Sequence, residues 1–261
     1  MKPCSPVVLG LDFGGTKIAV SVADRAGRRL GTTVVPTAPE RGARRNLERG
    51  VDAARALLRD AAPDAALAGV GASTFGIPGP DGIRLAPAIP GWEELALEHE
   101  LRRALACPHV RVANDVKAAA TAELRLGALR GCGHGIYVNL GTGLAAALVA
   151  GGEVVLGANG AAGEIGYSLV DREGIVAAEH EVLEDVASGI GLSAAVRRRT
   201  GRRLSAADVF ASGEFDDLVE TFRTQLAFQP EVPLSGRAVF GFLAGVVGGC
   251  GWIGRDYVVS V

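Results

Sequence analysis

The chain has 261 residues, 48% of them hydrophobic and 21% charged, which is enough for one large domain or two lobes with cores of their own. Its formal net charge of −2 argues against nucleic acid or an anionic membrane as the partner. The residues ahead of the first apolar stretch are too few for a signal peptide, and no apolar run has the length of a membrane span. We therefore expect a cytoplasmic protein that binds neither nucleic acid nor a membrane.

The cysteines are scattered, at positions 4, 107, 132 and 250. No two of them have the spacing of metal ligands, and a cytoplasmic setting disfavours disulfides. We expect reduced thiols and no metal site built on cysteine.

The hydrophobic pattern predicts strands that alternate with helices. In the first half, strands are expected at about 7–12, 17–23, 30–36 and 68–73, with an amphipathic helix over 42–61. A helix near 93–106 then leads to a strand at 109–113 and a helix at 116–126. In the second half, strands are expected at 134–140 and 144–150, and helices at 184–199, 205–212 and 215–228. This alternation indicates an α/β protein.

Residues 9–20 form the most informative segment, a strand, a glycine turn and a second strand. Gly14 and Gly15 let the backbone approach a phosphate closely, and Thr16 adds a hydroxyl donor. Asp12 can hold a metal-bound water beside that phosphate. The spacing differs from that of a Walker A loop and of a dinucleotide-binding glycine motif. An ordinary hairpin with a Gly-Gly turn is the alternative.

Four further segments follow in order. The first joins residues 76–80 to residues 86–92, and the other three are residues 112–115, with the pair Asn114-Asp115, residues 139–143, with the turn 141–143, and residues 157–166. Asn114 and Asp115 stand at the end of a predicted strand, where ligands collect in α/β folds. The alternative for this pair is a plain helix N-cap, a common position for both residue types.

These five segments together resemble the ROK family of bacterial sugar kinases and sugar-responsive repressors, from about residue 7 to about residue 192. The resemblance implies an α/β, actin-like (ribonuclease H-like) sugar-kinase fold of two lobes with a cleft between them. The N-terminal lobe would span residues 1–115 and the C-terminal lobe residues 116–261. The resemblance also implies ATP and Mg²⁺ as cofactors and a homodimer.

The family's roles carry over to matching positions. Asp115 matches the general base, which takes the proton from the attacking sugar hydroxyl. Phosphoryl transfer needs positioning and charge neutralisation more than covalent chemistry. Sugar-binding residues implied by the resemblance are Gly76, Asn114, Asp115, Glu164, Tyr167 and Glu184. Residues implied to hold the ATP phosphates and Mg²⁺ are Asp12, Gly14, Gly15, Thr16, Lys17, Gly141, Thr142 and Gly143.

The chain departs from the family's pattern at several places. Tyr167 stands where the family's Gly-Glu-x-Gly-His motif has the histidine that binds zinc and sugar, and residues 171–181 contain no cysteine where the family has a zinc-binding cluster. His180 and its two glutamate neighbours cannot all point at one tetrahedral metal, so no zinc is expected. Ala88 replaces an asparagine typical of glucose-directed members. Residues 240–261 do not follow the family, so the C-terminal part is expected to be shortened or altered.

The leading interpretation is ATP-dependent phosphorylation of a glucose-like hexose or amino-hexose, at the 6-hydroxyl. Carboxylates at Asp115, Glu164 and Glu184 favour a protonated amine, and Ala88 leaves room and removes competing donors. Kanosamine, the 3-amino sugar that related kinases phosphorylate in antibiotic pathways, fits this description. The alternatives are an ordinary glucokinase, a catalytically weak sugar-binding regulator without a DNA-binding domain, and an actin-like structural or chaperone ATPase.

Overall fold

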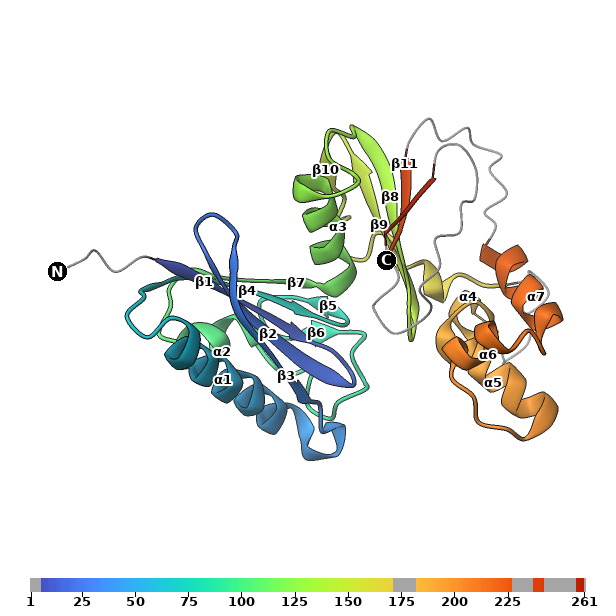
Figure 1. The fold of residues 1–261 in the computed structure, drawn as a ribbon, viewed down its shortest axis with the longest axis horizontal. Coiled ribbons are helices and arrows are strands. Elements are labelled where there is room, and N and C mark those ends of the chain that lie inside the picture. Colours follow the sequence, from blue (N-terminus) through green and yellow to red (C-terminus); the bar gives the residue numbers. More distant parts are fainter. Residues whose placement is uncertain (1–5, 171–181, 227–236, 242–256, 261) are drawn as a thin grey trace. The chain divides into compact units, whose positions relative to one another are not determined.

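The computed structural model describes residues 6–170, 182–226, 237–241 and 257–260. The chain divides into two compact units, Met1–Ala118 and Ala119–Val261, and Figure 1 shows the elements of each. The division falls within α3 (Asp115–Leu126), a few residues beyond the lobe boundary expected from the sequence.

The first unit is built on a five-stranded sheet of order β3-β2-β1-β4-β7. Its strands are β1 (Val7–Phe13), β2 (Lys17–Asp24), β3 (Arg29–Pro36), β4 (Leu67–Thr74) and β7 (Val110–Asn114). The first three run antiparallel, while β4 is parallel to both β1 and β7. Phe13 pairs with Thr74, and Thr74 pairs with Asn114, so the three parallel strands end in register at one edge.

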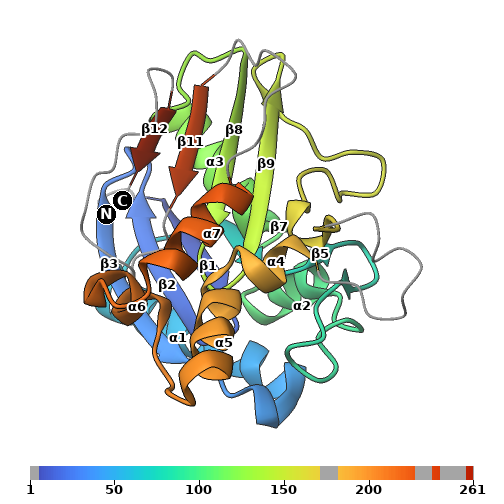
Figure 2. The same cartoon turned by 90° about the vertical axis from the view of Figure 1, so that its right-hand side faces the viewer.

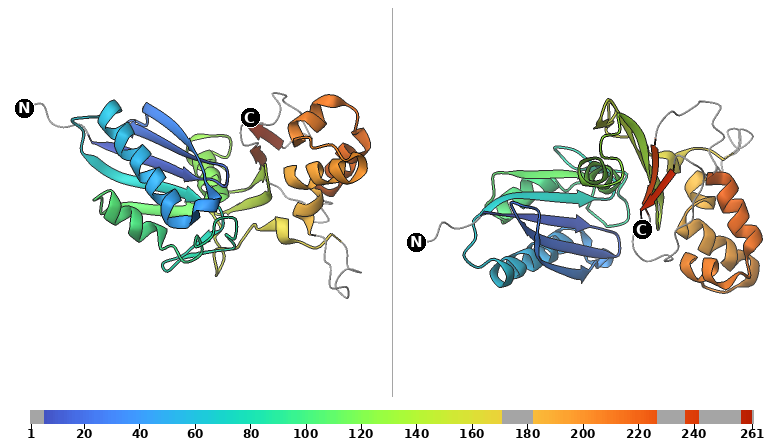
Figure 3. Two further views of the ribbon diagram at one scale, coloured as in Figure 1. Left: turned by 90° about the horizontal axis from the view of Figure 1, so that it is seen from below. Right: turned by 45° about the horizontal axis from the view of Figure 1, so that its top comes forward.

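Two helices, α1 (Gly42–Ala61) and α2 (Leu97–Ala104), pack on this sheet, as Figure 3 shows for α1. The core between the helices and the sheet forms because buried and more exposed side chains alternate along β2. Ile18, Val20 and Val22 are buried, and the side chains between them in the sequence are more exposed. Smaller elements are η1 (Pro39–Arg41) and the hairpin of β5 (Ile77–Pro78) with β6 (Ile83–Arg84).

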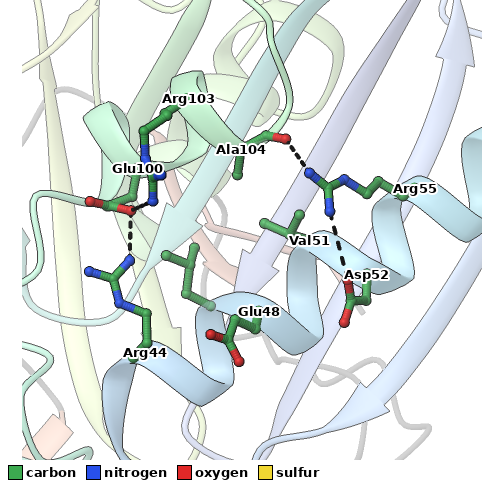
Figure 4. Close-up of a pocket in the computed structure, with 9 residues that line it drawn as sticks. Arg44, Glu48, Val51, Asp52, Arg55, Glu100, Arg103 and Ala104 are labelled. Carbon is green, nitrogen blue, oxygen red and sulfur yellow. Dashed lines mark hydrogen bonds and ion pairs between the residues drawn. The ribbon is translucent and has the colours of Figure 1, made fainter.

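A groove of about 500 Å³ lies between α1 and α2 within this unit (Figure 4). Its sides are charged, and the Glu100 carboxylate accepts hydrogen bonds from Arg44 and Arg103 there. None of the residues predicted to form the functional site lines this groove.

The second unit has a five-stranded sheet of order β10-β9-β8-β11-β12. Its strands are β8 (His134–Leu140), β9 (Leu144–Ala150), β10 (Glu153–Val154), β11 (Arg237–Gly241) and β12 (Tyr257–Ser260). The one-turn helix η2 (Ile165–Tyr167) follows β10. Four helices then come together, as Figure 2 shows: α4 (Leu183–Val186), α5 (Gly189–Thr200), α6 (Ala206–Ser212) and α7 (Asp216–Leu226).

Two expected helices differ from the observed ones. The helix expected over 184–199 is two helices, α4 and α5, because the buried Ser188 caps a new helix by accepting a hydrogen bond from the Gly191 N–H (3.1 Å). The helix expected over 93–106 is limited to α2. The fully buried Trp92 and the turn that follows it, with a hydrogen bond from Leu97 N–H to Leu95 O, delay the helix start.

Of the four cysteines, Cys107 is buried and Cys132 is partly exposed, both as free thiols, while Cys4 and Cys250 lie outside the described residues. Within the described ranges, no helix combines the length and the apolar character that a membrane crossing requires. The expected alteration of the C-terminal part falls largely on residues 242–256, which are outside the described ranges.

Candidate active site

The carboxyl edge of the first sheet brings together the predicted site residues of the first unit. The turn 14–16 follows β1, Gly76 lies just after β4, and Asp115 follows β7. Since these strands are parallel and end in register, the three segments lie side by side. Open α/β sheets bind their ligands at this edge.

The first glycine turn is held by hydrogen bonds that leave two amides available. Gly14 N–H donates to Lys17 O (3.0 Å), and Thr37 donates from its Oγ1 to Gly14 O (2.7 Å) and from its N–H to Thr16 O (3.0 Å). Among the described residues, none accepts from the N–H of Gly15 or of Thr16. A Cβ added at Gly15 would meet nothing within 4 Å, so there is room for a ligand to reach these amides. Such a turn can cradle a phosphate.

Asp12, on β1, is anchored by the neighbouring strand. Ser73, its register partner on β4, donates from Oγ to Asp12 Oδ1 (2.7 Å). The other carboxylate oxygen, Oδ2, has no hydrogen-bond partner in the described part of the chain. Carboxylate oxygens are the hard ligands that Mg²⁺ or its bound waters prefer, so this residue fits the role predicted for it.

Asn114 ends β7 and caps α3, and Asp115 is the first residue of that helix. Asn114 is only 6% exposed; its Oδ1 accepts from the Lys117 N–H (3.1 Å), and its Nδ2 donates to Gly76 O (2.9 Å). Asp115 Oδ1 accepts from the Val116 N–H (2.9 Å), and its carboxylate lies in the first helical turn, where the helix dipole favours negative charge. The N-cap interpretation is therefore correct for Asn114, while its predicted contact with a sugar hydroxyl stays a prediction.

Beneath this edge, an aromatic cluster fixes the strand ends. The fully buried Trp92 donates from Nε1 to Thr74 Oγ1 (3.0 Å), and its ring lies 5.6 Å from that of Phe13 and 5.7 Å from that of Phe75. Gly76 has a φ of +77°, and an added Cβ would lie 2.6 Å from Arg84 O, so only glycine fits there. Sequence reasoning singled out residues 86–92 and Gly76, but not this hydrogen bond to Thr74.

The second glycine turn, residues 141–143, connects β8 to β9. Gly141 N–H donates to Gly143 O (3.0 Å), while Gly189 N–H donates to Gly141 O (2.9 Å) and Ile190 N–H to Thr142 O (3.1 Å). The N–H groups of Thr142 and Gly143 have no acceptor among the described residues. This turn thus offers two adjacent amide donors, as the first turn does.

The predicted sugar-binding residues of the second unit share one neighbourhood. Glu184 Oε2 accepts from the Leu144 N–H (2.7 Å), just after the glycine turn. Tyr167, at the end of η2, is 56% exposed, and partial burial is the main cause that raises the pKa of its phenol, followed by the negative charges of Glu184 and Glu164. The phenol is therefore a protonated hydroxyl at neutral pH, next to two carboxylates.

Two features of the site lay beyond the sequence analysis. Lys117, in the first turn of α3, is 4% exposed, and the pattern gave no reason to expect a buried lysine there. Asn139, on β8, has a buried Oδ1 that accepts no hydrogen bond within the described ranges. An unsatisfied buried acceptor often marks the place of an ion or water.

The residues that the structure describes contain no group of three or more His, Cys, Asp or Glu side chains that could hold a metal ion. Residues 171–181, the segment with His180 that replaces the family's cysteines, fall outside the described ranges, so the prediction that zinc is absent stays a prediction.

The fold is the mixed α/β, actin-like fold of sugar kinases. A ROK family glucokinase from Streptomyces griseus, solved with glucose and AMPPNP, superposes with a TM-score of 0.69 at 26% identity, over 90% of this chain and 83% of that one. A model of the ROK family matches residues 8–229. The chain belongs to the ROK family.

Two curated relatives show how far the similarity extends. A glucokinase of Streptomyces coelicolor is 30% identical over 207 residues, which is 78% of this chain and 63% of the relative. A kanosamine kinase of Amycolatopsis mediterranei is 31% identical over 193 residues, 71% of this chain and 60% of the relative. The chain thus spans less than two thirds of the length of either relative.

Proposed function

We propose that this protein is an ATP-dependent sugar kinase that phosphorylates the 6-hydroxyl of a glucose-like sugar. The observation that carries this proposal is the carboxyl edge of the first sheet, which holds Asp115 in a first helical turn and, at the end of β1, a glycine turn with two unengaged amides. The S. griseus relative binds glucose and an ATP analogue, which supports the same pair of ligands for this chain.

In this reaction, Asp115 accepts the proton of the attacking hydroxyl, so that the oxygen becomes nucleophilic as the phosphoryl group leaves ATP. The N–H groups of Gly15, Thr16, Thr142 and Gly143 donate to phosphate oxygens, and Lys17 adds positive charge. Asp12 would hold Mg²⁺ or its waters. Magnesium, when bound, neutralises negative charge on the phosphates.

For the sugar, we propose an amino-hexose such as kanosamine, with glucose as the alternative. Glu164, Glu184 and the protonated Tyr167 hydroxyl form a patch with two negative charges and one donor, which suits a substrate that carries an ammonium group. The kanosamine kinase of A. mediterranei shares 31% identity with this chain. The proposal includes a homodimer that needs no zinc and a cytoplasmic location.

The test is ADP release, measured by a coupled assay with Mg·ATP and a panel of kanosamine, glucosamine, glucose and N-acetylmannosamine. We expect kcat/KM to be highest for kanosamine, and Asp115→Asn to lower kcat by roughly 10²–10⁴-fold while sugar binding is kept. A matched control is Asp216→Asn, which changes an exposed aspartate in the first turn of α7 and should leave kcat unchanged. A preference for glucose would refute the amino-sugar part alone.

Absence of ADP release with every sugar, together with retained sugar binding by calorimetry, would instead favour the sugar-binding regulator. Near-normal kcat in Asp115→Asn would refute the assignment of the general base.

A further inference from the structure

In the second unit, one segment contacts both the second glycine turn and the turn that carries Tyr167. Residues 183–190 include α4 and the first residues of α5. On one side, Gly189 and Ile190 donate their N–H groups to the carbonyls of residues 141 and 142. On the other side, Leu183 N–H donates to Ser168 O (2.7 Å), directly after η2. The segment is therefore a physical link between the two candidate binding turns.

Among the described residues, Glu184 is the only side chain of α4 that forms a hydrogen bond with the β8–β9 region, and it reaches both turns at once. Its Oε2 accepts from the Leu144 N–H (2.7 Å), and a Cβ added at Gly143 would collide with the same oxygen. A Cβ added at Gly166, in η2, would lie 3.3 Å from both Glu184 Cβ and Oε2. Two glycines therefore allow this carboxylate to fit closely against the end of one turn and the middle of the other.

We infer that Glu184 is a positioning residue for the nucleotide, in addition to its predicted contact with the sugar. Its hydrogen bond ties down the Leu144 N–H, which holds the Gly143 end of the turn and keeps the unengaged amides of Thr142 and Gly143 in place for phosphate oxygens. Because the same side chain packs against η2, sugar binding and nucleotide binding are coupled through it. This inference rests on the proposed sugar-kinase function.

Charge repulsion alone and a positioning role for Glu184 predict opposite changes in nucleotide affinity when its side chain is removed. A carboxylate next to a phosphate-binding turn repels the phosphates, so its removal by itself should strengthen nucleotide binding. If Glu184 positions the turn, removal of the whole side chain should weaken nucleotide binding, because the Leu144 N–H loses its charge-assisted acceptor and the turn loosens. The direction of the change therefore separates the two effects.

Two variants test this. Glu184→Gln keeps an amide oxygen that can accept from the Leu144 N–H but removes the charge, whereas Glu184→Ala removes both. The measurement is the Kd of Mg·AMPPNP by isothermal titration calorimetry, first with no sugar present and then with saturating sugar. The sugar-free titration excludes any effect that arises from a lost sugar contact. Asp185→Ala is the matched control, since Asp185 is the next acid on α4 and its carboxylate bonds only the Val182 N–H within the described residues (3.2 Å).

Without sugar, we expect Glu184→Ala to weaken Mg·AMPPNP binding by about tenfold, and Glu184→Gln to bind as tightly as wild type or more tightly. We also expect the ratio of the two Kd values, without and with sugar, to fall towards one in Glu184→Ala and to be retained in Glu184→Gln. Asp185→Ala should match wild type in both titrations.

An unchanged or tighter sugar-free Kd in Glu184→Ala would overturn the inference and leave Glu184 as a sugar ligand alone. Equal weakening in Asp185→Ala would also overturn it, because general loosening of α4 would then explain the result. If wild type itself does not bind Mg·AMPPNP, the proposed kinase function fails, which is a distinguishable outcome.

Discussion

The side-chain amide of Asn114 joins Gly76 to the start of α3: Nδ2 donates to Gly76 O at 2.9 Å, and Oδ1 accepts from the Lys117 N–H at 3.1 Å. One buried side chain thus fixes the turn after β4 relative to the helix that begins with Asp115. The direction of the Asp115 carboxylate depends on this helix start, so Asn114 acts on the proposed base even without touching a substrate.

Asn114→Ala removes both hydrogen bonds. We expect the free energy of unfolding to fall by about 1–3 kcal/mol, since the cap is lost and the Gly76 carbonyl is left without its partner. We also expect kcat to fall, because α3 starts less rigidly. The matched control is Asn46→Ala. Asn46 is fully buried and makes three hydrogen bonds to the backbone of residues 38 and 42, so its loss should destabilise to a similar extent.

Chemical denaturation and steady-state kinetics on both variants test whether Asn114 affects kcat beyond its effect on stability. Equal kcat in Asn114→Ala and Asn46→Ala, measured at a temperature where both are folded, would show that Asn114 serves stability alone.

The two glycines of the first turn should respond differently to substitution. Gly14 packs tightly, and an added Cβ would lie 2.9 Å from Lys17 O, whereas Gly15 has open space, and neither has a positive φ. We expect Gly14→Ala to destabilise the β1–β2 hairpin. We expect Gly15→Val to fold normally but to lose nucleotide binding, because the added side chain covers the two unengaged amides. Melting temperature and Mg·AMPPNP titration separate the effects. A wild-type Kd in Gly15→Val would contradict the phosphate role of this turn.

The strand ends and glycine turns near the predicted site residues could be predicted from the sequence for a physical reason. Apolar runs stop where Gly, Asp or Asn interrupts them, so β8 and β9 were predicted with their observed bounds, on either side of residues 141–143. The same pattern placed Asp115 directly after a strand, and it became a candidate site residue because ligands collect at the carboxyl ends of strands in α/β folds.

What could not be predicted depends on contacts between residues far apart in the chain. The bond from Leu144 N–H to Glu184 spans forty residues, and no local periodicity encodes it. The break before Ser188 was missed although Ser-Gly is a common helix start, because the apolar pattern continues across it. Burial of Lys117 was also missed, since lysine is rarely buried and its environment depends on tertiary packing.

The free energy of unfolding should fall at acid pH because the carboxylate of Glu100, which joins α1 to α2 (Figure 4), becomes protonated. Hydrogen bonds from Arg103 and then Arg44 hold the pKa of Glu100 below its usual value of 4.5. The charged form is therefore favoured by folding, so this stabilisation is present above about pH 4.5 and is lost as the pH falls through the lower folded pKa.

We expect Glu100→Gln to lower the free energy of unfolding by about 1 kcal/mol at pH 7, and by much less once the pH is below the folded pKa. Urea denaturation across pH 3–7 measures this, with Glu48→Gln as control, because Glu48 makes a more exposed ion pair with Arg45. A difference between wild type and Glu100→Gln that stays constant over this range would show that the carboxylate charge is not the cause.

Tyr167 should act as a hydrogen-bond donor that does not titrate in the working range. Because its pKa is raised by partial burial and by the charges of Glu184 and Glu164, the phenol keeps its proton beyond pH 10, the value of an ordinary tyrosine. We expect Tyr167→Phe to lower kcat/KM for the preferred sugar by about tenfold, through loss of the hydroxyl contact, without a change in the shape of the pH profile between pH 6 and 9.

Tyr167→His, by contrast, should add a titration step to the profile of kcat/KM near pH 6.5 or above, since the same two carboxylates favour a charged imidazole. Profiles of kcat/KM against pH for wild type and both variants, with kanosamine and with glucose, provide the measurement. Tyr167→Phe with wild-type kcat/KM for both sugars would exclude the phenol from the sugar contact, and a profile for Tyr167→His without the new titration step would place its imidazole away from the reacting sugar.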